Sequence, residues 1–140
     1  MSTEQRPPRR IFRGIAAILA GIISTVILSV GTDMALQSAG IYPPLSEPNR
    51  FTTQLLLVAT VYRTVYGVAG SYLTAMLAPD HPMRHALVLG VFGFVASIVG
   101  AIAMWDVGQH WYPLTLVALA IPGAWLGGKL YEMRRPLARA

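Results

Sequence analysis

Residues 86–105, "ALVLGVFGFVASIVGAIAMW", contain no charged side chain. A hydrocarbon core about 30 Å thick is crossed by an α-helix of about 20 predominantly apolar residues. The stretch has that length and composition, so it predicts one membrane-spanning helix. It also raises the question of how many similar blocks the rest of the chain contains.

Three further apolar blocks surround this one, at about 11–36, 51–78 and 111–130. The chain has 140 residues, of which 54% are hydrophobic and 12% charged, whereas about 25% charged residues is usual in soluble proteins. We therefore expect an all-α integral membrane protein: a single domain, residues 1–140, forming an antiparallel up-down-up-down bundle of four transmembrane helices. Because the chain lacks cysteine, disulfides, thiolate metal sites and cysteine nucleophiles are excluded.

The basic residues predict the orientation of this bundle. Nine of the eleven lie before the first block or at its start, in the loop between the second and third blocks, or at the end of the fourth block and after it. Arg50 lies on the other side, and Arg63 lies inside a block. These nine are Arg6, Arg9, Arg10, Arg13, Arg84, Lys129, Arg134, Arg135 and Arg139. The positive-inside rule then places both termini, as short basic tails over residues 1–10 and 134–140, in the cytoplasm of a cell with an inner membrane. Attraction to lipid headgroups explains the net charge of +5 without a nucleic-acid partner.

The first block has a second interpretation, because a basic start before an apolar stretch is also typical of a cleaved signal peptide. The apolar stretch is long, however, and "ALQSAG" (35–40) is a poor cleavage site, so we favour an uncleaved span. The connection over residues 37–50 contains "YPPLSEPN", whose prolines predict an extended loop over the bundle mouth. The loop within residues 78–85 is also broken by prolines and short, which predicts a tight hairpin.

Small residues predict how the helices pack, because helices in lipid associate where their backbones can approach closely. The third block has a seam of small residues, the fourth has GxxxG spacing, and the first two offer shorter sets. In chain order these residues are Ala17, Gly21, Gly67, Ser71, Ala75, Gly93, Ala96, Gly100, Ala103, Gly123 and Gly127. Pro122 is expected to kink the last helix. Small-residue faces left over could bind a second copy or another membrane protein.

The stretch "TVYRTVYGVAGSYLTA", residues 60–75, places Arg63 inside the second span. At about 100° per residue, Arg63 shares a hydroxyl-rich face with Thr60 and Thr64, whereas Tyr62 falls on the opposite, apolar face. Arg63 lies about 18 Å from the outer end of its block at 1.5 Å per residue, near the bilayer midplane. A charge there costs about 2.5–3.5 kcal/mol. A counter-ion, carbonyl groups or water must offset that cost.

Asp33 is the best counter-ion for Arg63, because it lies near the outer end of the first span, about 10 Å above the arginine backbone. Asp106 at the outer end of the third span is the second choice. Tyr66 and the threonine hydroxyls could form hydrogen bonds at depths between those of Arg63 and Asp33. We expect an outward-opening polar pocket lined by Arg63, Asp33, Thr60 and Thr64. The full set of candidate site residues is Arg63, Asp33, Thr60, Thr64, Tyr66 and Asp106.

Motifs for catalysis and metal binding are absent from the sequence. It contains no phosphate-binding glycine loop, HExxH motif, nucleophile elbow or pair of intramembrane acids. His81 and His85 flank Pro82, which prevents one helical face from holding both, so a solvated loop is favoured over a metal site. We therefore expect no catalytic residues, no metal and no cofactor.

Two interpretations of Arg63 remain open from the sequence. Either it forms a structural ion pair, or it binds an anionic solute or a lipid headgroup, since a guanidinium fork matches carboxylate and phosphate geometry. Our leading hypothesis is a non-enzymatic accessory or interaction module of the inner membrane. The alternative is a transporter or channel subunit that binds a small anion or headgroup at Arg63. An enzyme acting on lipid is the third hypothesis.

Overall fold

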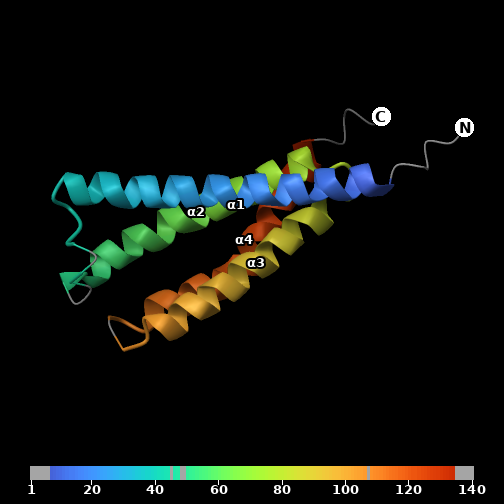
Figure 1. Cartoon of the computed structure of the whole chain (residues 1–140). Coiled ribbons are helices and arrows are strands. Elements are labelled where there is room, and N and C mark those ends of the chain that lie inside the picture. Colours follow the sequence, from blue (N-terminus) through green and yellow to red (C-terminus); the bar gives the residue numbers. More distant parts are fainter. Residues whose placement is uncertain (1–6, 45, 48–49, 107, 135–140) are drawn as a thin grey trace, which may run out of the picture.

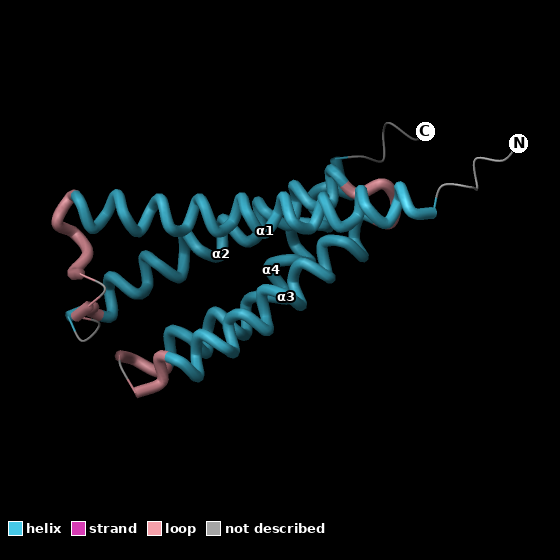
Figure 2. The backbone as a smooth tube through the Cα atoms, in the orientation of Figure 1, coloured by secondary structure: helices cyan, strands magenta, loops and turns pink. Residues whose placement is uncertain are grey.

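The computed structural model describes residues 7–44, 46–47, 50–106 and 108–134. Within these residues the chain forms four α-helices. They are α1 (Pro7–Ser38), α2 (Thr53–Leu77), α3 (Pro82–Ala103) and α4 (Trp111–Arg134), and Figures 1 and 2 show them as a set of long rods joined by short connections.

The first and last helices, α1 and α4, are longer than the apolar blocks that predict them. α1 begins at Pro7, so residues 7–10 are helical and were wrongly assigned to the tail. Prolines are tolerated in the first turn of a helix, because its N–H groups have no intrahelical partner. The remaining tail residues 1–6 and 135–140 lie outside the described part of the chain. At the other end, α4 continues to Arg134.

Local sequence signals set the limits of the two central helices. Thr52 caps α2, accepting a hydrogen bond at its hydroxyl oxygen from the backbone N–H of Leu55 at 3.3 Å. Ala78 ends α2 in an extended conformation, as expected for a residue before a proline. Pro82 then occupies the first turn of α3, a position where proline is common.

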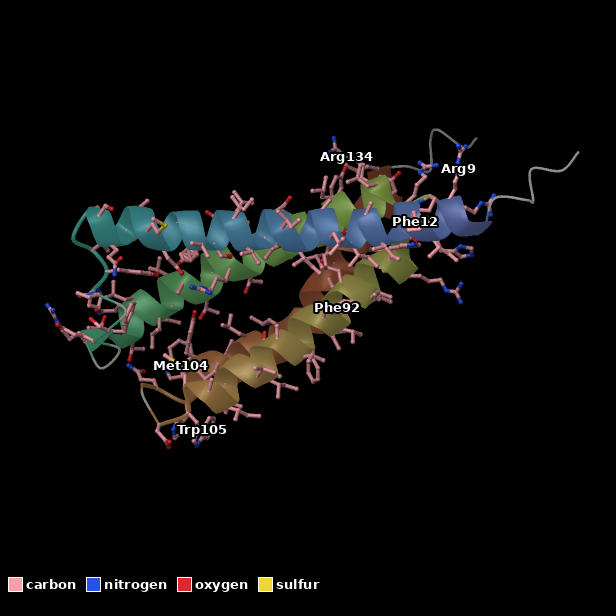
Figure 3. The ribbon with its side chains drawn as sticks, in the orientation of Figure 1. Arg9, Phe12, Phe92, Met104, Trp105 and Arg134 are labelled. Atoms are coloured by element: carbon pink, nitrogen blue, oxygen red, sulfur yellow. The ribbon has the colours of Figure 1, made fainter. Side chains whose placement is uncertain are left out.

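The connections place the basic residues together. In Figure 1 the connection between α2 and α3 lies at the same end of the molecule as the start of α1 and the end of α4. The other two connections lie at the opposite end, where the α1–α2 and α3–α4 pairs diverge. Figure 3 shows Arg9 and Arg134 at the first end, and Met104 and Trp105 at the second.

Three of the four helices are long and apolar enough to cross a membrane: Arg9–Ser38, Pro82–Ala103 and Trp111–Arg134, with mean hydropathies of 2.2, 2.5 and 1.3. Only 22%, 22% and 17% of their most apolar stretches are buried inside the molecule. Most of their apolar side chains therefore face outward, which is unfavourable in water and favourable in lipid. The chain is thus a helical bundle with three candidate membrane-spanning helices, as in a multi-pass membrane protein.

α2 is not one of these three helices. Its composition and its position in the bundle both differ from theirs. Arg63 and three tyrosines lower its hydropathy. α2 also packs against each of the other three helices, so less of its surface faces outward. Its buried residues include Thr60, Ser71 and Thr74, whereas Val58 and Val65 are 51% and 55% exposed. The hydroxyl-rich face of α2 therefore points into the bundle.

α1 and α2 approach closely at two glycines. A Cβ atom added at Gly21 would lie 2.7 Å from the backbone oxygen of Gly70, and one added at Gly70 would lie 2.9 Å from that of Gly21. Just beside this crossing, Thr74 is fully buried and donates from Oγ1 to the backbone oxygen of Ala17 at 2.9 Å. Small residues here permit both the close approach and a direct hydrogen bond between helices.

α4 packs through its small residues against both α2 and α3. A Cβ atom at Gly127 would lie 2.7 Å from the Cβ of Ser71 on α2. One at Gly128 would lie 3.0 Å from the Cβ of Ala86 on α3. Gly127 belongs to the predicted GxxxG pair, and Gly128 beside it makes the second contact.

The structure contradicts two of the small-residue packing assignments: the seam on α3, and Gly67 on α2, where an added Cβ would meet no atom within 4 Å. A Cβ at Gly100 would meet no atom within 4 Å, and Ala96 and Ala103 are exposed. The buried residues of α3 are Ala86, Leu89, Gly90 and Ala101. At 100° per residue the seam lies on nearly the same side of the helix. Its last residues stay open because they lie toward the end where the α1–α2 and α3–α4 pairs diverge.

Candidate functional site

The site is centred on an ion pair between α1 and α2. Nη2 of Arg63 donates to Oδ2 of Asp33, and the hydroxyl of Tyr62 donates to Oδ1 of the same carboxylate. The side chain of Arg63 is 34% exposed and that of Asp33 is 18% exposed. Both carboxylate oxygens are therefore engaged, and the charge of Arg63 is neutralised within the bundle.

Aromatic contacts hold this ion pair in place. The Cζ atom of Arg63 lies 5.9 Å from the ring centroid of Tyr62, within the range of a cation–π contact. The ring of Tyr62 stacks on that of Tyr66 with centroids 5.7 Å apart. The hydroxyl of Tyr66 lies 2.8 Å from Oγ1 of Thr32. One turn of α2 is thus tied to consecutive residues of α1.

Tyr62 is the residue that sequence reasoning misplaced. Its backbone position does lie away from the hydroxyl-rich face, but a tyrosine side chain is long enough to reach the carboxylate from the side. Two features of the sequence could have identified Tyr62 as a site residue: it is adjacent to Arg63, and it lies four residues before Tyr66.

The other candidate residues have different environments. Thr60 is 9% exposed and donates to the backbone oxygen of Leu56 at 2.8 Å, so its hydroxyl is satisfied within α2. Tyr66 pairs with α1 rather than with the ion pair. Asp106 is exposed beyond the end of α3 and is not a partner of Arg63 among the described residues.

A cavity of about 490 Å³ adjoins Arg63 at mid-height of the bundle. Residues 22–30 of α1, 63–71 of α2, 89–97 of α3 and 116–124 of α4 contribute to its lining, so it is surrounded by the central part of every helix. Arg63 and Thr64 line it, but Asp33 and Thr60 do not. The pocket is therefore deeper and more apolar than the outward-opening one expected from the sequence.

Two residues that line this cavity each have a polar atom without a hydrogen-bond partner within the described residues. These atoms are Nε of Arg63 and Oγ1 of Thr64, both buried. Buried polar atoms in proteins are nearly always paired. The Nε–H group of an arginine is a donor only. Two buried groups beside the cavity therefore lack a hydrogen-bond partner, and one of them, the Nε–H of Arg63, can be satisfied only by an acceptor.

His81 and His85, at the start of α3, do not form a second site. Nδ1 of His85 lies 3.1 Å from the backbone oxygen of His81, and His81 lies 3.6 Å from Asp80. Asp80 also pairs with Arg10 at 3.8 Å, with both side chains largely exposed. Over the described part of the chain, no group of three or more His, Asp or Glu residues is arranged to hold a metal ion.

No protein-family model matches the chain, and neither a curated protein nor a solved structure matches it significantly. The geometry of the site therefore carries the functional argument.

Proposed function

We propose that the chain is a non-enzymatic accessory or interaction module of the inner membrane. In this proposal α2 also crosses the bilayer, so four antiparallel spans run up-down-up-down and both termini lie in the cytoplasm. The supporting observation is the Arg63–Asp33 pair with its Tyr62 partner. Because a charge near the midplane is costly, an internally neutralised arginine in the middle of α2 is what a spanning helix requires.

The charges at the two ends support the same orientation. Arg9 and Arg134 lie at one end of the molecule (Figure 3), with Arg84 at the start of α3. Arginine-rich ends are retained in the cytoplasm. The aromatic pair Trp105 and His110, with ring centroids 3.8 Å apart, lies at the other end, as expected for an interface with water.

Cysteine labelling tests this topology, because the chain contains no native cysteine. We choose Ser46→Cys in the connection before α2 and Arg84→Cys at the start of α3, since both positions are exposed. An impermeant maleimide added outside intact cells should label position 46 and leave position 84 unlabelled until the membrane is opened. If both positions react from the same side, α2 does not span and the four-span proposal is wrong.

The interaction part of the proposal rests on the last turns of α3, beyond the cavity, where Gly100 and Ala103 are exposed. Exposed small residues of this kind favour close helix contacts in lipid. Gly100→Cys should give a disulfide-linked dimer in membranes if a second copy docks on these turns. Val95→Cys, exposed and about 140° away on the same helix, is the control. Equal dimer yields at both positions would exclude specific docking of a second copy on these turns.

The alternative is a transporter or channel subunit that binds a small anion or lipid headgroup at Arg63. The observation that favours it is the cavity reaching Arg63. Against it, Asp33 already neutralises the guanidinium, so an added anion would lie beside a carboxylate.

A further inference from the structure

The central cavity has an opening toward the surroundings of the bundle. Among its lining residues, Val26 and Val30 of α1 and Phe92 of α3 are 53%, 49% and 56% exposed. Figure 3 marks Phe92 midway along α3. α1 packs mainly on α2, and α3 mainly on α4. The rim of the cavity therefore lies between α1 and α3, and a molecule could enter sideways.

If the four helices span the bilayer as proposed, this opening faces the hydrocarbon core. Arg63 lies about 15 Å along the axis of α2 from its first residue, so the cavity is near the midplane. Ester groups of phospholipids lie at the edge of a core about 30 Å thick. They are therefore about 15 Å away from Arg63 and Thr64. A ligand for these two groups must carry its polar atoms into the core.

The two unpaired groups define the polar chemistry of the ligand. Nε of Arg63 requires an acceptor, and Oγ1 of Thr64, on the next residue, can donate as well. An anionic acceptor is disfavoured, because Asp33 neutralises the guanidinium from its other side and the medium is poorly polarisable. A neutral carbonyl oxygen accepts both hydrogen bonds without adding a charge.

The walls define the apolar chemistry. α3 contributes Leu89 and Phe92 beside small residues such as Gly93, and α4 contributes Leu116 and Leu119 beside Ala120. These uncharged, mostly apolar walls suit a hydrocarbon ring and tail. At about 490 Å³ the cavity falls within the usual range for small-molecule sites, about 300–1,000 Å³.

We infer that this cavity binds a neutral, lipid-soluble carbonyl compound of the quinone class, whose carbonyl oxygen accepts hydrogen bonds from Arg63 and Thr64. The inference rests on the proposed four-span topology and adds a ligand class to the same polar site. The ring lies between the apolar walls of α3 and α4, and the apolar tail leaves between α1 and α3.

Equilibrium binding of tritiated decyl-benzoquinone to the full chain in phosphatidylcholine nanodiscs tests this inference. Saturable binding at one site per chain is expected. Gly67 lines the cavity, and a Cβ added there meets no atom within 4 Å, so Gly67→Leu should fill the cavity and abolish binding. Gly100→Leu adds the same side chain at an exposed position outside the cavity and should bind like the wild type.

A second pair of variants tests the hydrogen bond and does not depend on Gly67→Leu folding. Thr64→Val keeps the shape but removes the hydroxyl, and should weaken binding about 3- to 10-fold. Thr115→Val removes a hydroxyl that bonds within α4 to the backbone oxygen of Trp111, and should not change binding. Size-exclusion profiles in detergent identify any variant that misfolds.

Three outcomes would overturn the inference. They are no saturable quinone binding by the wild type, equal binding by Gly67→Leu, or displacement of the quinone by decanoate, which has the same tail length but an anionic head. The last outcome supports the anion-binding alternative. Cysteine labelling decides the topology independently, so loss of quinone binding with positions 46 and 84 on opposite sides rejects the ligand and leaves the four-span bundle intact.

Discussion

Arg63 on α2 donates to the carboxylate of Asp33, which lies thirty residues earlier on α1. The two side chains are 34% and 18% exposed, so neither charge is fully solvated. Removal of one partner from a buried pair leaves the other uncompensated, and this costs more than the intact pair contributes. The pair is therefore best studied by changing both residues as well as each alone.

Arg63→Leu and Asp33→Leu should each lower the free energy of unfolding by about 3–5 kcal/mol, because each leaves one charge unpaired. The double variant should recover much of that loss, since it leaves no charge. Unfolding in mixed micelles, followed by circular dichroism, measures the three values. Additive losses in the double variant would show that the two side chains do not stabilise each other.

Tyr62→Phe should lower the free energy of unfolding by about 1–2 kcal/mol, because it removes the second hydrogen bond to the Asp33 carboxylate while Arg63 stays in place. Tyr66→Phe is the matched control. Its hydroxyl bonds to Thr32, whose Oγ1 also contacts the backbone oxygen of Leu28, so its loss should cost less. If Tyr66→Phe proves the more harmful change, Tyr62 is not a partner of the ion pair.

The sequence predicts the helices well because their signal is local. Block length, prolines and basic flanks set the helices to within a few residues, and the inward direction of Thr60 and Arg63 follows from the 100° turn. Side chains that reach around a helix are not specified by that angle, which is why Tyr62 was misplaced. The open end of the α3 seam also escaped prediction, because it depends on where the two helix pairs diverge. The size and position of the cavity depend on all four helices together.

Gly21→Ala and Gly127→Ala should each destabilise the bundle by about 1–3 kcal/mol, because an added methyl group must displace neighbouring atoms. At Gly21 it would lie 2.7 Å from the backbone oxygen of Gly70, and at Gly127 2.7 Å from the Cβ of Ser71. Thermal unfolding in detergent measures the loss.

Gly31→Ala and Gly100→Ala are the controls for these packing variants, since an added Cβ meets no atom within 4 Å at either position. Both lie within helices, where alanine is favoured over glycine by up to about 1 kcal/mol. They should therefore be neutral or stabilising. Equal losses at buried and open positions would mean that the close approach of α1 to α2, and of α4 to α2, is not what these glycines permit.

Thr74→Val tests the hydrogen bond that joins α1 to α2 at their closest approach. Thr74 is fully buried and donates to the backbone oxygen of Ala17 at 2.9 Å, whereas valine keeps the branched shape without the donor. Hydrogen bonds between membrane helices average about 0.6 kcal/mol and reach about 1.7 kcal/mol. Because the Ala17 oxygen already accepts within α1 as a helix carbonyl, we expect a loss near the lower figure, measured by unfolding in mixed micelles. Thr115→Val, whose hydroxyl bonds only within α4, should change stability less. A larger loss at Thr115 than at Thr74 would show that this contact does not hold the two helices together.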